Sequence, residues 1–91
     1  MRYTLSYHPY VVKQDIPTLS TANKKRIRTA IEAKLTEQPE VFGIPLRHSK
    51  KGDRRLRVGA FRVIFRIVGK EVKIYLIEHR SVVYTLLDKR T

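Results

Sequence analysis

The feature that most constrains the fold is a change of hydrophobic period at Arg54. From there to Ile77, apolar and polar residues alternate, and the alternation is interrupted at Gly59-Ala60 and again at Gly69-Lys70. A period of two is typical of half-buried strands, and two-residue breaks that contain glycine are typical of hairpin turns. The segment therefore predicts three antiparallel strands, 54–58, 61–68 and 71–77, connected as a meander.

The residues before the meander predict one more strand and two helices. Residues 3–7 are aromatic and partly β-branched, which favours a strand. Residues 10–15 predict a short helix closed before Pro17, because a residue that precedes proline is disfavoured in the helical conformation. The segment 39–46 contains two prolines and a glycine, so we expect a linker there, with a turn at 50–53.

The longest predicted helix begins at Ser20 or Thr21 and runs to about Gln38. Either hydroxyl can cap the first turn, and apolar residues then recur at fourfold spacing along one helix face: Ile27, Ile31 and Leu35. This stripe suits packing on an apolar sheet face. The order of strand, two-helix hairpin and meander predicts a single α+β domain over residues 1–91, with the helices on one face of the sheet.

The two hairpin turns also determine how the strands pair, and therefore which residues share a face. Arg57 is expected opposite Arg62, while Ile64 is expected opposite Tyr75 and Arg62 opposite Ile77 on the third strand. One face collects apolar residues, namely Leu56, Val58, Phe61, Val63, Phe65, Ile67, Val72, Ile74 and Leu76. The other face collects cations, namely Arg55, Arg57, Arg62, Arg66, Lys73 and His79.

The cationic face favours a polyanionic partner. Like charges directly across a strand pair are unfavourable in water, whereas a phosphate between two guanidinium groups makes the pair favourable. The whole chain has the same bias, with 20 Lys and Arg against 8 Asp and Glu and a net charge of +12. Charge alone does not separate RNA from DNA, an anionic lipid or an acidic protein, and a solvated positive face is the alternative.

The composition excludes several other kinds of chemistry. The chain has no cysteine, and its three histidines show no metal-ligand spacing, so we expect no disulfide, no metal and no cofactor. No apolar run approaches the length of a bilayer span, and the first residues do not resemble a signal peptide. We therefore expect a soluble, cytoplasmic protein without a membrane partner.

The cationic face suits cleavage of RNA without a metal. Such cleavage needs a base for the 2′-hydroxyl, cations for the phosphorane, and an acid for the leaving 5′-oxygen. Arginines suit the second role because their fork matches two phosphate oxygens. Histidine ionises near neutral pH, so His79 is a candidate base, and Tyr84 is a second. The alternatives are a structural hydrogen bond for His79 and core packing for Tyr84.

Two stretches of the chain resemble the RelE/ParE toxin superfamily. They are LRVGAFRVIFRI at 56–67, which matches the pattern L-R-x-G-x-[YF]-R, and HRSVVY at 79–84. The resemblance covers nearly all of the chain and implies a RelE-like fold. In the RelE branch it implies metal-independent cleavage of messenger RNA in the ribosomal A site, with a 2′,3′-cyclic phosphate as product. It also implies a cognate antitoxin as partner.

The resemblance further implies roles for single residues. Arg62 would orient the scissile phosphate, Arg80 would lie near the leaving group, and Tyr84 would be the C-terminal active-site tyrosine. Where the family pattern has two lysines, this chain has Asp53 and Arg55, which leaves the general base open among His79, Tyr84 and His48. Arg55 remains a catalytic candidate. The residues expected to bind RNA are Arg54, Arg57, Arg66, Lys50, Lys51, His48 and Lys73.

Two other functions are compatible with the same sequence. A ParE-like toxin shares the superfamily fold but inhibits DNA gyrase without catalysis. A plain basic nucleic-acid-binding module would need only the charge of +12, and its histidine and tyrosine would be incidental. The ribonuclease toxin is the preferred interpretation, because the facing arginines lie next to residues that are able to exchange protons.

Overall fold

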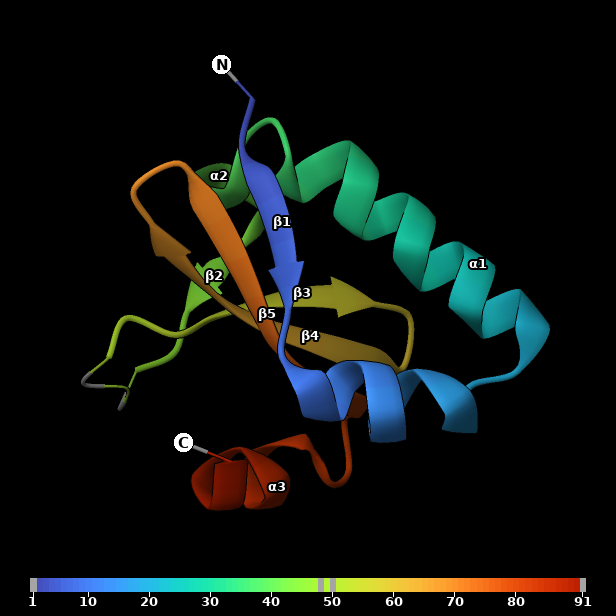
Figure 1. Cartoon of the computed structure of the whole chain (residues 1–91). Helices are drawn as coiled ribbons and strands as arrows, with labels where there is room; N and C mark the ends of the chain where they lie inside the picture. The colour runs from blue at the N-terminus through green and yellow to red at the C-terminus, as the bar shows by residue number, and fades with distance from the viewer. Residues whose placement is uncertain (1, 48, 50, 91) are drawn as a thin grey trace.

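The computed structural model describes residues 2–47, 49 and 51–90, without the side chains of residues 88 and 90. Its centre is a five-stranded sheet in the order β1-β5-β4-β3-β2 (Figure 1). The strands are β1 (Thr4–Tyr7), β2 (Ile44–Pro45), β3 (Arg54–Val58), β4 (Phe61–Val68) and β5 (Glu71–His79). The predicted N-terminal strand and meander are confirmed, with β1 added parallel to β5.

Helical segments connect and cover the sheet. They are η1 (Val11–Asp15), η2 (Ile16–Thr18), α1 (Thr21–Ala30), η3 (Ile31–Leu35), α2 (Pro39–Phe42) and α3 (Val83–Arg90). Ser20 caps α1, because its Oγ accepts a hydrogen bond from the backbone N–H of Asn23 at 3.2 Å. The α+β fold class is confirmed. None of the helices in the described part of the chain has the length and apolarity to span a bilayer.

One sequence-based prediction for the helical half is confirmed and another is wrong. The first short helix, η1, ends at Asp15 before Pro17 as predicted, and it is followed directly by η2, whose first turn contains this proline. Proline is tolerated there since the first N–H groups of a helix need no partner within it. The expected linker at 39–46 contains α2 and β2 instead. Pro39 opens α2, and Pro45 lies on the edge strand, where proline is also tolerated.

The main core lies between the sheet and the helix formed by α1 and η3. The predicted stripe of Ile27, Ile31 and Leu35 is buried there, at 3%, 1% and 0% exposure, against Leu56, Val63 and Phe65 of the sheet. Burying a large apolar side chain stabilises the fold by about 1.5–3 kcal/mol relative to leaving it in water. This helix stripe therefore holds β3, β4 and β5 in one orientation.

A second cluster packs on the opposite face of the sheet. It consists of Ile64 and Leu76 from the sheet together with Val83 and Leu87 from α3. The sequence predicted helices on one face of the sheet only, but the segment after the meander forms α3, which lies across the other face (Figure 1). The face expected to carry the cations is therefore partly covered by a helix.

A β-bulge at Tyr75 changes the pairing of β4 with β5. Phe65 pairs with Ile74, but Ile64 pairs with Leu76, so Tyr75 is an extra residue on β5. The prediction that Ile64 lies opposite Tyr75 and Arg62 opposite Ile77 is therefore wrong. Beyond the bulge the side chains exchange faces: Leu76 joins the α3 cluster, although it was expected in the main core, and Ile77 joins the main core.

A buried carboxylate supports the bulged part of β5. The pairing of β1 with β5 reaches only from residue 71 to 74, so the following residues have no strand on that side. Asp15, which is 2% exposed at the end of η1, accepts a hydrogen bond from the backbone N–H of Ile77 at 2.9 Å. Because buried backbone N–H groups require a partner, Asp15 takes the place of the missing strand at this point.

Gly43 is expected to be intolerant of a side chain. A Cβ at this position would lie 2.1 Å from Cζ of the buried Phe65, far inside van der Waals contact. Since overpacking a core costs about 1–3 kcal/mol, we expect Gly43→Ala to lower the free energy of unfolding by about 2 kcal/mol in urea titrations. Gly43→Ala/Phe65→Leu should cost less than the sum of its single changes, because leucine leaves room for the methyl group. Additive costs would contradict this explanation.

Candidate functional site

The arginine face is the set of Arg55, Arg57 and Arg62 on the α3 side of the sheet. Its pairing is as predicted, with Arg57 opposite Arg62 and Arg55 opposite Ile64 across β3 and β4. Arg57 is exposed, and the other two are half-buried. The Gly59-Ala60 turn sets this register, because Gly59 has a φ of +60° that a tight hairpin turn requires. Three guanidinium groups are thereby placed at neighbouring positions of one hairpin.

Tyr84 of α3 reaches the arginine face. Its phenolic oxygen accepts a hydrogen bond from Nη1 of Arg55 at 2.8 Å. The contact follows from the packing of α3, because Val83 is buried against the sheet while the next residue, Tyr84, remains 43% exposed beside β3. Core packing of the Tyr84 ring, the alternative considered from the sequence, does not describe this position. A half-exposed hydroxyl is instead held next to a cation.

Arg62 is held by the turn that precedes it. Its Nη1 donates hydrogen bonds to the carbonyl oxygens of Gly59, at 3.0 Å, and Phe61, at 2.9 Å. These bonds use one nitrogen of the fork, and the other guanidinium nitrogens have no hydrogen-bond partner among the described residues. Arg62 is therefore oriented by the backbone and keeps donors that match the two oxygens of a phosphate.

His79 does not lie on the arginine face, and that prediction is wrong. The bulge pairs His79 with Phe61 on the face of α1, and it puts Glu78 opposite Arg62 instead. The His79 ring contacts Phe61 edge to face at 5.8 Å, and its Nδ1 accepts the backbone N–H of Ser81 at 3.2 Å. The structural alternative considered for this histidine therefore describes its contacts, and we leave His79 out of the proposed site.

Arg80 lies in the turn between β5 and α3. Its backbone N–H donates to the carbonyl oxygen of Ala60 at 2.8 Å, and the residue is exposed. This bond ties the turn after β5 to the hairpin turn that orients Arg62. The structure thus brings the turns of Arg80 and Arg62 together, although the two residues are 18 positions apart in the chain.

Three residues predicted to bind RNA have partners inside the protein. Arg54 donates to the carbonyl oxygen of Gly43 at 3.0 Å and so caps α2. Arg66 forms an ion pair with Asp53, and the hydrogen bond that it donates to this carboxylate raises the pKa of the guanidinium further above its usual value. Nζ of Lys73 lies 3.9 Å from Oε1 of Glu71. We leave Arg54 and Arg66 out of the proposed site because their guanidinium groups stabilise the fold.

The segment before β3 contributes further basic residues. Lys51 is exposed, and its backbone N–H donates to Oγ of Ser49 at 3.3 Å. His48 and Lys50, also predicted to bind RNA, lie outside the described residues. The sequence reasoning missed Arg47, which is exposed in the same segment, and Glu78 beside Arg62. The basic run at 47–51 could have identified Arg47 from the sequence, whereas the position of Glu78 opposite Arg62 depends on the bulge.

The arrangement is suited to hold a phosphate next to a proton donor. Arg57 and Arg62 face each other across two strands, and Arg55 lies beside them with the Tyr84 hydroxyl. Because Arg55 already donates to the phenolic oxygen, the Tyr84 O–H proton is available for a ligand. Among the described residues, no cluster of three or more His, Asp and Glu side chains could hold a metal ion.

Comparisons with known proteins identify the fold of this chain through solved structures. No protein-family model matches the chain, and no curated protein matches it. A chain of the toxin–antitoxin complex RelBE2 from Mycobacterium tuberculosis matches with a TM-score of 0.79 and 24% identity, over 88% of this chain and all of that one. A double arginine-to-alanine mutant of the E. coli toxin RelE in the free state matches with a TM-score of 0.72 and 20% identity, over 99% of this chain and 98% of that one. With these TM-scores and coverages, this chain has the RelE-like fold.

Proposed function

We propose that this protein is the toxin of a type II toxin–antitoxin system and cleaves messenger RNA on the ribosome. The observation that carries the proposal is the hydrogen bond between Arg55 and Tyr84 on a face that also holds Arg57 and Arg62. A plain nucleic-acid-binding module requires only positive charge. A tyrosine hydroxyl fixed among arginines adds a group that can transfer a proton beside a phosphate.

The proposed reaction is attack of a 2′-oxygen on the adjacent phosphorus. The bond to the 5′-oxygen breaks, which gives a 2′,3′-cyclic phosphate and a 5′-hydroxyl, and the 2′-hydroxyl proton passes to water. Arg57 and Arg62 bind the non-bridging oxygens and stabilise the charge of the phosphorane. Tyr84 donates its proton to the leaving 5′-oxygen, and Arg55 stabilises the resulting phenolate. Arg80 stabilises negative charge on the leaving strand.

The proposed partners follow from charge and from the fold. A net charge of +12 favours contact with ribosomal RNA as well as with the message. It equally favours an acidic antitoxin, and one of the solved structures with this fold is named as a toxin–antitoxin complex. We propose that such an antitoxin covers the arginine face and that both proteins act in the cytoplasm.

Mapping transcripts after brief expression in bacteria tests the function. Primer extension should reveal new 5′-ends at codon-phased positions within translated messages, and an inhibitor of translation should suppress them. Purified protein and ribosomes should yield fragments that end in a 2′,3′-cyclic phosphate. Intact transcripts together with double-strand DNA breaks would overturn the proposal and indicate inhibition of gyrase.

A further inference from the structure

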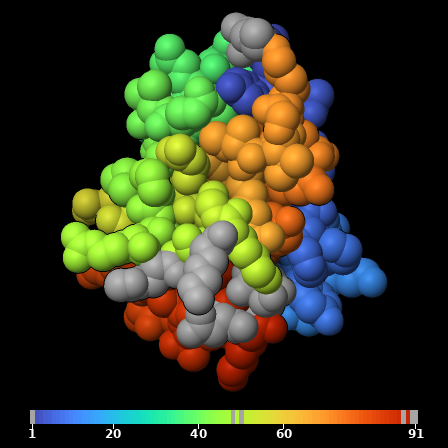
Figure 2. Space-filling view, turned by 90° about the vertical axis from the view of Figure 1, so that its left-hand side faces the viewer, coloured from blue at the N-terminus to red at the C-terminus, as the bar shows by residue number. Residues whose placement is uncertain are grey.

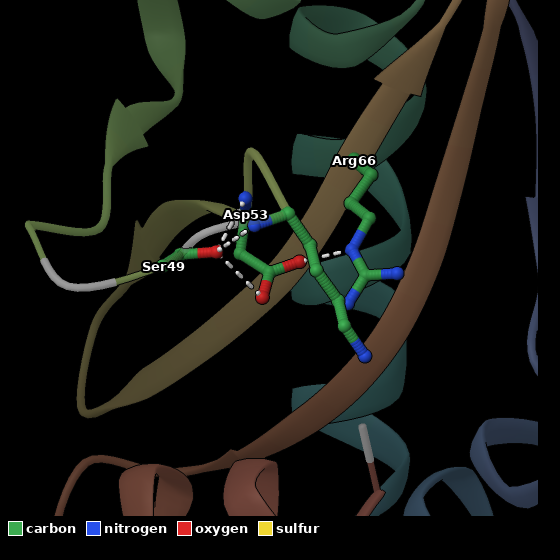
Figure 3. A network of polar contacts seen from close by, with 4 residues as sticks. Ser49, Asp53 and Arg66 are labelled. Carbon is green, nitrogen blue, oxygen red and sulfur yellow. Dashed lines mark hydrogen bonds and ion pairs between the residues drawn. The ribbon is translucent and has the colours of Figure 1, made fainter.

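We propose that Asp53 and Arg66 form a clamp that positions the basic segment before β3 for binding to the RNA backbone. The inference rests on the proposed function and names two positioning residues for it. Asp53 is 5% exposed, and one of its carboxylate oxygens forms an ion pair with Nε of Arg66 on β4 (Figure 3). The other accepts a hydrogen bond from Oγ of Ser49 at 3.1 Å.

The sheet side of the clamp is largely buried. Arg66 is 16% exposed along its side chain, and its guanidinium carbon lies 4.4 Å from the centre of the Tyr75 ring. Tyr75 is the extra residue of the bulge in β5, so the clamp joins two strands of the sheet at a defined irregularity. Because Arg66 is committed to Asp53 and to this ring, it acts as an anchor for the neighbouring segment.

The segment side of the clamp connects the two ends of the segment, Leu46 and Asp53. The backbone N–H of Leu46 donates to the carbonyl oxygen of Asp53 at 2.9 Å. Oγ of Ser49 accepts the backbone N–H groups of Asp53, at 3.0 Å, and Lys51, at 3.3 Å. One serine hydroxyl therefore connects the backbone of the segment to the Asp53 carboxylate, and through it to Arg66.

The clamped segment carries exposed cations at one end of the sheet. Arg47 and Lys51 are both exposed, and the described part of the segment lies on the same face of the molecule as α3 (Figure 2). A mobile segment would lose conformational freedom when its side chains bind a phosphate, at a cost of about 0.5–1.5 kcal/mol for each long side chain. A segment that is already held in place avoids part of this cost.

Because Asp53 is negatively charged, removing its charge tests the inference by whether RNA binding becomes stronger or weaker. A carboxylate near a polyanion-binding surface weakens long-range attraction, so removing it should strengthen RNA binding if Asp53 has no other role. If Asp53 positions the segment, removing it should weaken binding although the net charge rises. The two outcomes are opposite.

The experiment compares Asp53→Asn with Glu32→Gln. Each change raises the net charge by one, but Glu32 lies in η3, where it pairs with the exposed Arg28 of α1 and takes no part in the clamp. With a short single-stranded RNA of mixed sequence at fixed ionic strength, Asp53→Asn should raise the Kd about fivefold, whereas Glu32→Gln should leave it unchanged or lower it. Equal or tighter binding by Asp53→Asn would overturn the clamp.

Limited digestion with trypsin supplies a readout that does not depend on RNA. Cleavage after Arg47 and Lys51 should be about fivefold faster in Asp53→Asn than in the wild type, and unchanged in Glu32→Gln. Asp53→Glu, which retains the charge, should restore part of the protection. Unchanged cleavage in Asp53→Asn would contradict the proposal.

Misfolding of Asp53→Asn and a lack of RNA binding by the wild type have different consequences for the proposal. If Asp53→Asn does not fold, as judged by circular dichroism, Ser49→Ala replaces it, because this change removes the connecting hydroxyl without altering charge. Ser49→Ala should show the same faster cleavage and weaker RNA binding. Wild-type protein that binds no RNA would instead refute the proposed function, while the trypsin comparison would still show whether the clamp orders the segment.

Discussion

Tyr84→Phe is expected to lower the rate of RNA cleavage by about a hundredfold or more and to abolish growth arrest. Proton transfer by a positioned side chain contributes about 10²–10⁴-fold to a reaction rate, and the substitution removes the hydroxyl that Arg55 holds at 2.8 Å. The fold should persist, because the ring is 43% exposed and α3 is held by Val83 and Leu87. Single-turnover cleavage on programmed ribosomes is the direct measurement.

Two controls separate this role from a general loss of activity. Tyr3 directly precedes β1, and its hydroxyl donates a hydrogen bond to Glu40 at 2.7 Å. The Tyr3→Phe variant, which lacks this hydroxyl, should cleave RNA at the wild-type rate. A substrate with sulfur in place of the bridging 5′-oxygen has a leaving group that needs no proton. This substrate should therefore restore cleavage by Tyr84→Phe, and failure to do so would assign Tyr84 a role other than acid.

Asp15→Ala should lower the free energy of unfolding by about 3 kcal/mol. The change removes a hydrogen bond to a carboxylate that is 2% exposed and leaves the backbone N–H of Ile77 buried without this acceptor. Urea unfolding followed by circular dichroism gives the total, and amide hydrogen exchange at Ile77 reports the local effect. Exchange there should accelerate more than at Val63 in the centre of the sheet.

Asp15→Asn separates the hydrogen bond from the charge. The amide oxygen retains an acceptor at the same position, so we expect a loss of about 1 kcal/mol, well below that of Asp15→Ala. Equal losses in the two variants would show that the negative charge, rather than the acceptor, is what the Ile77 N–H requires.

Much of the fold could be predicted because its signals are local. The glycine-containing turns fixed the β3–β4 register, and the spacing of Ile27, Ile31 and Leu35 identified the buried helix face. The bulge at Tyr75 could not be predicted, because no glycine or proline marks it. Its support, Asp15, is 62 residues distant from Ile77 in the chain, and such a contact leaves no periodic pattern.

The candidate site was predictable to a similar extent. Arg55, Arg57, Arg62 and Tyr84 were identified from the sequence, and their catalytic and binding roles remain predictions. The contact between Arg55 and Tyr84 spans 29 residues and depends on how α3 packs, so it could not be derived from the predicted pairing of the strands. The ion pair of Arg66 was not predicted, because its partner, Asp53, precedes β3 and appeared as a turn residue.

The bulge also affects how chains with this fold should be aligned. A gapless alignment of β5 with a strand that lacks the extra residue would match Ile77 to the position opposite Arg62, which Glu78 occupies here. Counting back from α3 gives the correct correspondence for residues 76–79, whereas counting forward from the Gly69 turn gives it for residues 71–74. Functional motifs near the end of this strand are therefore transferable between relatives only when a one-residue gap is allowed inside it.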